Sequence, residues 1–114
     1  MNLREVAAIL EATVVSGDDR ALDTEVSTAE AGDLMSDILS RSVATDVLLT
    51  GLNTAQVIRT ASVTTSRAVI IVRGKGAGEK LVQLAREEGI VLMTTNRGLF
   101  AASGLLYQGG LRPT

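Results

Sequence analysis

Three short polar segments, at residues 50–53, 73–76 and 94–97, carry side chains of the kind that bind anions. Each of them comes directly after an apolar run that predicts a buried strand. The residues that we select from these segments are hydroxyls, a turn glycine, an amide and two cations: Thr50, Gly51, Asn53, Arg73, Lys75, Thr94 and Thr95. Together with the free N–H groups of helix N-termini, such side chains suit a phosphate or a carboxylate.

Ordinary structural roles account for the same residues, so both interpretations stay open. Asn53 and Gln56 have the spacing of a reciprocal N-cap, which predicts a helix that begins at Asn53. Asn96 likewise predicts the start of the last helix, Gly51 permits a tight turn, and the two cations are explained as exposed loop residues. The glycine-rich segment 74–79 matches neither a P-loop nor the dinucleotide fingerprint.

Two carboxylates, Asp33 and Asp37, flank Ser36 four residues apart on a predicted helix. Paired acids can act as general acid and base, but Asp33 as a helix cap and Asp37 in the first turn need no catalytic role. The chain has no His and no Cys, which removes the commonest general base and the thiol nucleophile. The adjacent Asp18 and Asp19 read as turn residues and not as a metal site. We therefore predict no catalytic residue, no metal site and no cofactor.

The composition is that of one globular domain, residues 1–114, with 46% hydrophobic and 21% charged residues. The core must be aliphatic, because Phe100 and Tyr107 are the only aromatic residues. The net charge is -2, and the two signs are interspersed, which argues against a nucleic acid or an anionic membrane as partner. No apolar run approaches the ~20 residues that cross a bilayer, so we expect a cytoplasmic protein.

The hydrophobic pattern predicts helices and strands that alternate over most of the chain. We expect helices at 2–10, 33–41, 53–61, 79–88 and 96–107, and strands at 13–16, 24–29, 47–50, 68–72 and 90–93. The predicted fold class is α/β, a three-layer α/β/α sandwich with a mostly parallel sheet of about five strands. The polar strand 24–29 is expected at an edge of the sheet or paired across a dimer. In the last helix we expect Phe100 and Tyr107 on the buried side and Gly104 at a close approach to a neighbouring element.

Several runs of residues, taken in order, give the chain a likeness to a known family. These runs are Gly32–Leu39, Leu48–Leu52, Gln56–Ala61, Val72–Lys75, Leu99–Ala102 and Leu106–Tyr107. As a set they resemble the DRTGG domain family over nearly the whole chain. The pentapeptide that gives the family its name does not occur in this sequence.

The resemblance implies a regulatory module and not an enzyme. Similar domains lie in bacterial phosphate acetyltransferases and between the paired CBS domains of some family II pyrophosphatases, where the regulatory region binds adenine nucleotides, including diadenosine polyphosphates. The N-terminal domain of HPr kinase/phosphorylase has a related fold. Dimer contacts are common in the family. The positions that carry over as ligand-binding candidates are Ser36, Asp37, Thr50, Gly51, Arg59, Arg73 and Lys75.

The functional hypothesis is therefore a non-catalytic regulatory domain that senses a nucleotide or another small phosphorylated ligand as a homodimer. The alternative is a ligand-free module that acts by dimerisation or by docking to a protein partner encoded nearby. The polar strand 24–29 and the small residues around Gly104 favour this alternative.

Overall fold

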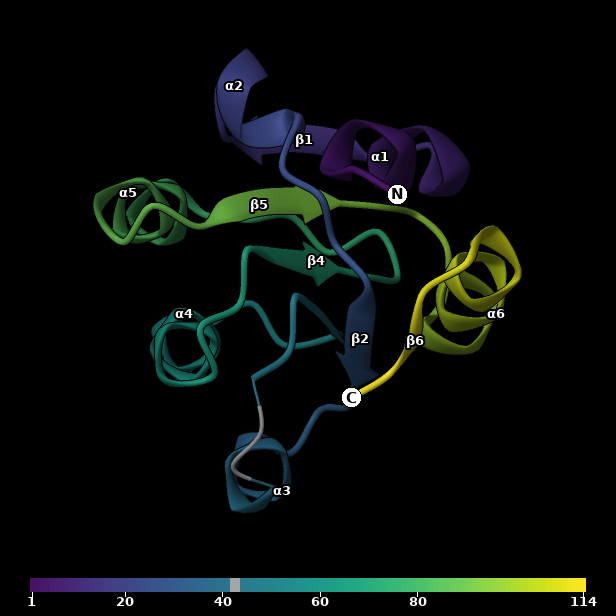
Figure 1. Cartoon of the computed structure of the whole chain (residues 1–114). Helices are drawn as coiled ribbons and strands as arrows, with labels where there is room; N and C mark the ends of the chain where they lie inside the picture. The colour runs from purple at the N-terminus through teal and green to yellow at the C-terminus, as the bar shows by residue number, and fades with distance from the viewer. Residues whose placement is uncertain (42–43) are drawn as a thin grey trace.

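The computed structural model describes residues 1–41 and 44–114. Helices and strands alternate along the described chain as the pattern predicts (Figure 1). The helices are α1 (Leu3–Leu10), α2 (Asp19–Leu22), α3 (Met35–Ser40), α4 (Ala55–Val63), α5 (Glu79–Glu87) and α6 (Leu99–Gly109). The strands are β1 (Thr13–Ser16), β2 (Thr28–Ala31), β3 (Val47–Thr50), β4 (Ala68–Ile71), β5 (Val91–Thr94) and β6 (Arg112–Pro113).

The strands form one mostly parallel sheet in the order β1-β5-β4-β3-β2-β6. Strands β2, β3, β4 and β5 are parallel neighbours, and each is joined to the next by one helix. Strand β1 adds to β5 in the antiparallel direction, and β6 adds to β2 in the parallel direction. Every residue of β3 and β4 is buried, as expected for parallel strands that are covered on both faces.

Helices cover both faces of the sheet, so the predicted three-layer α/β/α fold is confirmed (Figure 1). Helices α3, α4 and α5 pack on one face, with Val57, Ile58 and Leu81 against Leu48 and Ile71 of the sheet. Helices α1 and α6 pack on the other face and bury one further set of aliphatic side chains. The core is aliphatic on both sides, as the composition requires.

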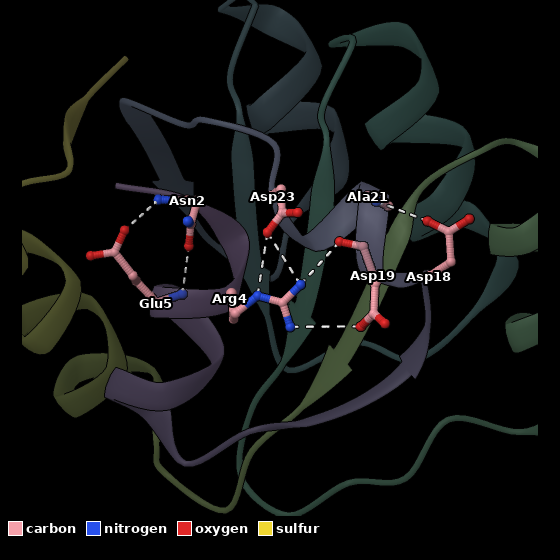
Figure 2. A network of polar contacts seen from close by, with 7 residues as sticks. All are labelled: Asn2, Arg4, Glu5, Asp18, Asp19, Ala21 and Asp23. Carbon is pink, nitrogen blue, oxygen red and sulfur yellow. Dashed lines mark hydrogen bonds and ion pairs between the residues drawn. The ribbon is translucent and has the colours of Figure 1, made fainter.

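The first helix begins with the capping box that its sequence predicts (Figure 2). The Asn2 side chain accepts from the Glu5 N–H at 2.9 Å, and the Asn2 N–H donates to Glu5 Oε1 at 3.1 Å. Arg4, on the exposed side of α1, forms an ion pair with Asp23 at 3.2 Å and donates to the Asp19 carbonyl. These contacts anchor α2 beside α1 at the amino-terminal part of the chain.

The position of the polar strand differs from the prediction. The polar strand lies at residues 28–31 and not at 24–29, and it is hydrogen-bonded on both sides, to β3 and β6. On the side away from β3, strand β6 pairs only with Thr28 and Ala29, the first half of β2. The sheet has six strands in the described chain, because β6 follows α6 and pairs with the start of β2. A strand of two residues leaves no periodic signal in a sequence.

The buried side of α6 also differs from the prediction. Ala102 and Leu106 face the core, whereas Phe100 is 94% exposed and Tyr107 55% exposed. Gly104 is exposed, and a Cβ added to it would meet nothing within 4 Å. The close approach lies instead at Gly109, where an added Cβ would be 2.7 Å from Met1 Cε.

Candidate functional site

The parallel strands direct four loops to one edge of the sheet. We call this the carboxyl edge: the loops at residues 32–34, 51–54, 72–78 and 95–98, which follow β2, β3, β4 and β5. This is the edge at which open α/β sheets bind ligands. Thr50, Gly51, Asn53, Arg73, Lys75, Thr94 and Thr95 all lie in these loops or at the strand ends beside them. The structure thus brings seven of the predicted residues to a common edge.

Asp33 joins the first two loops of the carboxyl edge. Its Oδ1 accepts from the Gly51 N–H at 2.7 Å and from the Thr50 hydroxyl at 3.2 Å. Thr50 Oγ1 in turn accepts from the Leu52 N–H at 3.1 Å. The prediction that Asp33 caps the following helix is wrong, because the N-cap of α3 is Leu34. The Asp33 carboxylate instead bonds to the end of β3, the neighbouring strand, which runs parallel to β2.

Asn53 joins the second loop to the third. Its Nδ2 donates to the Gly76 carbonyl at 2.9 Å. The predicted N-cap role is wrong, since α4 begins after Thr54 and has no side-chain cap. The side chain of Asn53 therefore fixes the glycine-rich loop against the loop that follows β3.

Arg73 and Gly74 turn the third loop toward the fourth. Both residues have left-handed backbone angles, with φ of 68° and 70°. Their N–H groups donate to the Arg97 and Thr95 carbonyls at 2.8 and 2.9 Å. The left-handed conformation is costly for a residue with a Cβ, and these two hydrogen bonds hold Arg73 in it.

Thr94, at the end of β5, and Thr95, directly after it, differ in their burial and so in their availability to a ligand. Thr95 is buried, and its hydroxyl donates to the Leu10 carbonyl at 2.8 Å, so this group is committed to the packing of α1. Thr94 is the half-buried last residue of β5. Asn96, predicted to cap the last helix, does not do so, because α6 begins after Gly98.

Two cations of the carboxyl edge are free of ion pairs among the described residues. Arg73 and Lys75 are exposed, and neither has a carboxylate within ion-pair distance in residues 1–41 and 44–114. Arg97 is different, because its Nη2 lies 2.6 Å from Glu11 Oε1. Its Nε is buried and finds no hydrogen-bond partner in the described chain. Arg73 and Lys75 are therefore the cations of this edge whose charge is not paired with a carboxylate in the described chain.

The helices that begin at the carboxyl edge lack side-chain caps. Among the described residues, the N-cap positions of α4, α5 and α6, namely Thr54, Gly78 and Gly98, make no side-chain hydrogen bond to the helix. By contrast α1 and α2, whose N-termini are elsewhere, are capped by Asn2 and Asp18. Uncapped helix starts leave N–H donors and the positive end of the dipole for an anion.

The remaining three candidates lie outside the loops of the carboxyl edge. Ser36 and Asp37 are exposed on α3, where Asp37 Oδ2 is 3.7 Å from Arg41 Nη2. Arg59 is exposed in the middle of α4. Ser36 and Asp37 thus lie in the first turn of α3, directly after the loop at residues 32–34, whereas the other seven candidates lie in the loops of the edge or at the strand ends beside them.

Hollows of similar size occur at both ends of the sheet. At the carboxyl edge, Leu10, Glu11, Thr95, Asn96 and Arg97 line a space of about 410 Å³. At the opposite edge, a space of about 500 Å³ is lined in part by Asp46, Ser66, Arg67 and Glu88. Size therefore does not distinguish the two edges; what distinguishes the carboxyl edge is its uncapped helices and the two cations that have no ion pair in the described chain.

Asp46, which sequence reasoning missed, is a structural residue at that opposite edge. Its Oδ2 accepts from the Ser27 and Thr28 N–H groups at 2.8 and 3.3 Å. Partial burial acts to raise the pKa of Asp46, but these hydrogen bonds, the Ser27 hydroxyl and the charge of Arg67 outweigh burial and lower it. The signal in the sequence is an Asp directly before a buried strand, a position from which a carboxylate can reach the start of the neighbouring strand.

No group of three or more acidic side chains in residues 1–41 and 44–114 is placed to hold a metal ion. None of the helices described is both long and apolar enough to cross a membrane.

The architecture is that of a three-layer α/β domain with its loops gathered at the carboxyl edge. No family model matches the chain, and no curated protein matches it. A solved structure does share the fold: the CBS and DRTGG domains of the regulatory region of Clostridium perfringens pyrophosphatase, complexed with the activator diadenosine tetraphosphate. The superposition has a TM-score of 0.75 at 16% sequence identity, and it covers 96% of this chain.

At this identity the likeness shows the fold. The resemblance to DRTGG domains that the sequence indicates is thus confirmed at the level of architecture. The chain spans about half of the structure that it matches, 47% of that chain.

Proposed function

We propose that residues 1–114 form a non-catalytic regulatory domain that senses a nucleotide or another small phosphorylated ligand at the carboxyl edge. The observation that carries the proposal is the combination of three uncapped helix N-termini, those of α4, α5 and α6, with two cations free of ion pairs in the described chain. Free N–H groups at helix N-termini and the charged side chains of arginine and lysine both bind phosphate in proteins.

The solved neighbour supports a nucleotide as the ligand. That regulatory region is complexed with diadenosine tetraphosphate, which acts there as an activator. None of the four loops of the carboxyl edge carries an aromatic side chain on which a base could stack; the nearest in sequence is the exposed Phe100, in the first turn of α6. We therefore infer that phosphate groups supply most of the binding energy and that adenine nucleotides with several phosphates bind best.

Each candidate residue has a proposed part in this site. Arg73 and Lys75 pair with phosphate oxygens, and Asn53 holds the glycine-rich loop in place through Gly76. Thr50, Gly51, Thr94 and Thr95 shape the floor of the site at the ends of β3 and β5. Ser36, Asp37 and Arg59 are proposed to contact the remote part of a long ligand that extends along α3 and α4.

Calorimetric titration tests the proposal with four probes: diadenosine tetraphosphate, ATP, AMP and inorganic phosphate. We expect affinity to increase with the number of phosphates and to fall with added salt, because the contacts are ionic and exposed. Arg73→Ala and Lys75→Ala should each weaken binding about tenfold, which corresponds to one charged hydrogen bond of about 1.4 kcal/mol. Arg86→Ala is the matched control, because Arg86 is an exposed arginine in the last turn of α5.

Three outcomes of the titration would contradict the proposal. If none of the four probes binds at about 1 mM, the sensing hypothesis is wrong. If a probe binds and the double variant of Arg73 and Lys75 binds equally well, the ligand site lies elsewhere in the fold. Binding that Arg86→Ala weakens as much as Arg73→Ala would indicate an unspecific charge effect.

A second candidate function is a ligand-free module that acts by dimerisation or by docking to a protein partner. One observation favours it, the exposure of Phe100 and Tyr107 on an uncharged helix. Calorimetric titration and sedimentation velocity without ligand separate this candidate from the first, because a docking module associates without any phosphorylated ligand.

A further inference from the structure

A third cation of the carboxyl edge, Arg97, already has an anion beside it. Its Nη2 lies 2.6 Å from Oε1 of Glu11, which comes 86 residues earlier in the chain. Glu11 belongs to none of the four loops of the edge, because it follows α1 and is the C-cap of that helix. The carboxylate that pairs with Arg97 is therefore brought to the carboxyl edge by a helix packed on one face of the sheet.

Backbone hydrogen bonds place Arg97 beside the loop that carries the two unpaired cations. The Arg73 N–H donates to the Arg97 carbonyl at 2.8 Å, and the Gly74 N–H donates to the Thr95 carbonyl at 2.9 Å. The Arg97 N–H in turn donates to Thr95 Oγ1 at 3.3 Å. The backbones of Arg73 and Arg97 are thus in contact, and both side chains have several rotatable bonds, so one anion is within reach of both.

The end of α1 is fixed to the same loop without the help of the Glu11 side chain. The Thr95 hydroxyl donates to the carbonyl of Leu10, which is fully buried, at 2.8 Å. The Glu11 N–H donates back to the Ala8 carbonyl at 3.2 Å. The Glu11 side chain, by contrast, is 79% exposed. Its carboxylate is therefore free to turn into solvent while the backbone around it stays in place.

The ion pair borders the hollow of about 410 Å³ that Leu10 and Glu11 line together with Thr95, Asn96 and Arg97. The guanidinium group there is only partly used. It has five N–H donors, of which Glu11 Oε1 takes one at Nη2, and its buried Nε has no hydrogen-bond partner in the described chain. A phosphate group commonly takes two parallel donors of an arginine. Arg97 therefore has more to offer a phosphate than Glu11 takes from it.

We propose that Arg97 is a further cation of the ligand site and that Glu11 occupies it until a phosphate group takes the place of the carboxylate. This role rests on the function proposed above, because it concerns the same ligand at the same edge. The exchange favours a phosphate for two reasons. An exposed ion pair contributes little to stability, so its loss costs little. A phosphate also carries more charge and more acceptor oxygens than a carboxylate does.

Glu11 then makes the site selective for ligands with several phosphates. A small carboxylate or chloride gains little by replacing Glu11, because it offers Arg97 no more charge than Glu11 does. A polyphosphate that is already held by Arg73 and Lys75 has a further phosphate close to Arg97 at a high effective concentration, so the exchange takes place within the complex. The internal carboxylate thus discriminates against single anions that are common in the cell.

Calorimetric titration with ATP, and separately with diadenosine tetraphosphate, tests this role through a gain of affinity. Glu11→Gln keeps the size of the side chain and removes its charge, so it should tighten the binding of both probes about fivefold, or about 1 kcal/mol. Arg97→Gln should weaken binding about threefold relative to the wild type. In the Arg97→Gln background, Glu11→Gln should bring little or no gain, because the arginine that it releases is absent.

Asp19→Asn is the matched control. Asp19 is likewise an exposed carboxylate beside an arginine, 3.7 Å from Arg4, but it lies in α2, which follows the end of β1 that pairs with the start of β5. The change alters the net charge by the same amount, so affinity should change by less than about 1.5-fold. Glu11→Gln should also keep the melting temperature within about 2 °C of the wild type, which distinguishes the release of Arg97 from a change of the fold.

Three outcomes would overturn this role while the proposed function stands, because in each the wild type binds a probe. Glu11→Gln leaves the affinity unchanged; Asp19→Asn tightens binding as much as Glu11→Gln; or the gain from Glu11→Gln persists in full without Arg97, in which case Glu11 acts by simple repulsion of the ligand. If neither the wild type nor Glu11→Gln binds either probe at about 1 mM, both the role of Glu11 and the sensing function are wrong. A gain that requires Arg97 supports the exchange.

Discussion

Replacing Asp46 should destabilise the fold in a way that depends on pH. Its Oδ2 receives the Ser27 N–H at 2.8 Å, with the Thr28 N–H and the Ser27 hydroxyl each at 3.3 Å. In return the Asp46 N–H donates to Thr28 Oγ1 at 3.0 Å. This reciprocal set joins the start of β2 to the start of β3, where Ala29 pairs with Val47. Asp46 therefore fixes the register of the polar strand.

The size of the effect follows from the number and quality of these bonds. One short hydrogen bond to a charged group contributes about 1.5–3 kcal/mol, and the two longer bonds add less because Ser27 and Thr28 are accessible to water. We expect Asp46→Ala to cost about 2–3 kcal/mol of unfolding free energy. Asp46→Asn keeps an oxygen acceptor and loses only the charge, so it should cost about 1 kcal/mol.

Denaturant unfolding between pH 3 and pH 7 distinguishes charge from packing. Because the pKa of Asp46 is lowered in the folded state, its charge stabilises the fold fully above the unfolded pKa of about 3.9, and this contribution is lost as pH falls through the folded pKa. The difference between wild type and Asp46→Asn should therefore be constant near neutral pH and shrink below about pH 4.

Asp19→Asn serves as the control for this experiment. Asp19 is 95% exposed and lies 3.7 Å from Arg4, so its removal should change stability by less than about 0.5 kcal/mol. Equal losses for Asp46→Asn and Asp19→Asn would refute the reasoning. So would an Asp46→Asn difference that stays the same from pH 7 to pH 3, because the carboxylate charge would then have no part in it.

Three further changes test the packing of the carboxyl edge. Thr95→Val keeps the shape but leaves the Leu10 carbonyl unpaired, so denaturant unfolding should show a loss of about 1–2 kcal/mol. Gly51→Ala places a Cβ 3.3 Å from Asp33 Oδ1, and thermal unfolding should show a loss of about 1 kcal/mol; an unchanged midpoint would mean that Asp33 moves aside freely. Asn53→Ala should leave stability within about 0.5 kcal/mol, because Asn53 is exposed, and yet weaken nucleotide binding in calorimetry by releasing the loop at Gly76.

The architecture could be predicted where the sequence pattern is strong. The apolar runs that became β3, β4 and β5, with helices between them, determine a parallel sheet with both faces covered. The capping box at Asn2 was also readable, because both partners lie within one helical turn. Strand β2 was misplaced because Asp46, far along the chain, decides where it begins.

Side-chain roles at the carboxyl edge were harder to predict than their location. Asp33 and Asn53 have the residue type of helix caps, and the same polar groups serve equally well in bonds between loops. Only the tertiary arrangement distinguishes the two uses. Phe100 and Tyr107 were predicted to be buried because they are apolar, but an uncharged helix has no polar side to indicate which face is outward.

The order of strands also has a consequence for how the chain folds. The four central strands come from successive βα units, so each pairing closes a short loop of chain. The outer strands come from opposite ends of the sequence, since Thr13 pairs with Thr94 and Thr28 pairs with Arg112. Pairings between such distant residues are slow to form and gain nothing until the centre exists. The central β2-β3-β4-β5 unit should therefore assemble first and protect its amide hydrogens longest, while β1 and β6 close the sheet last and open first.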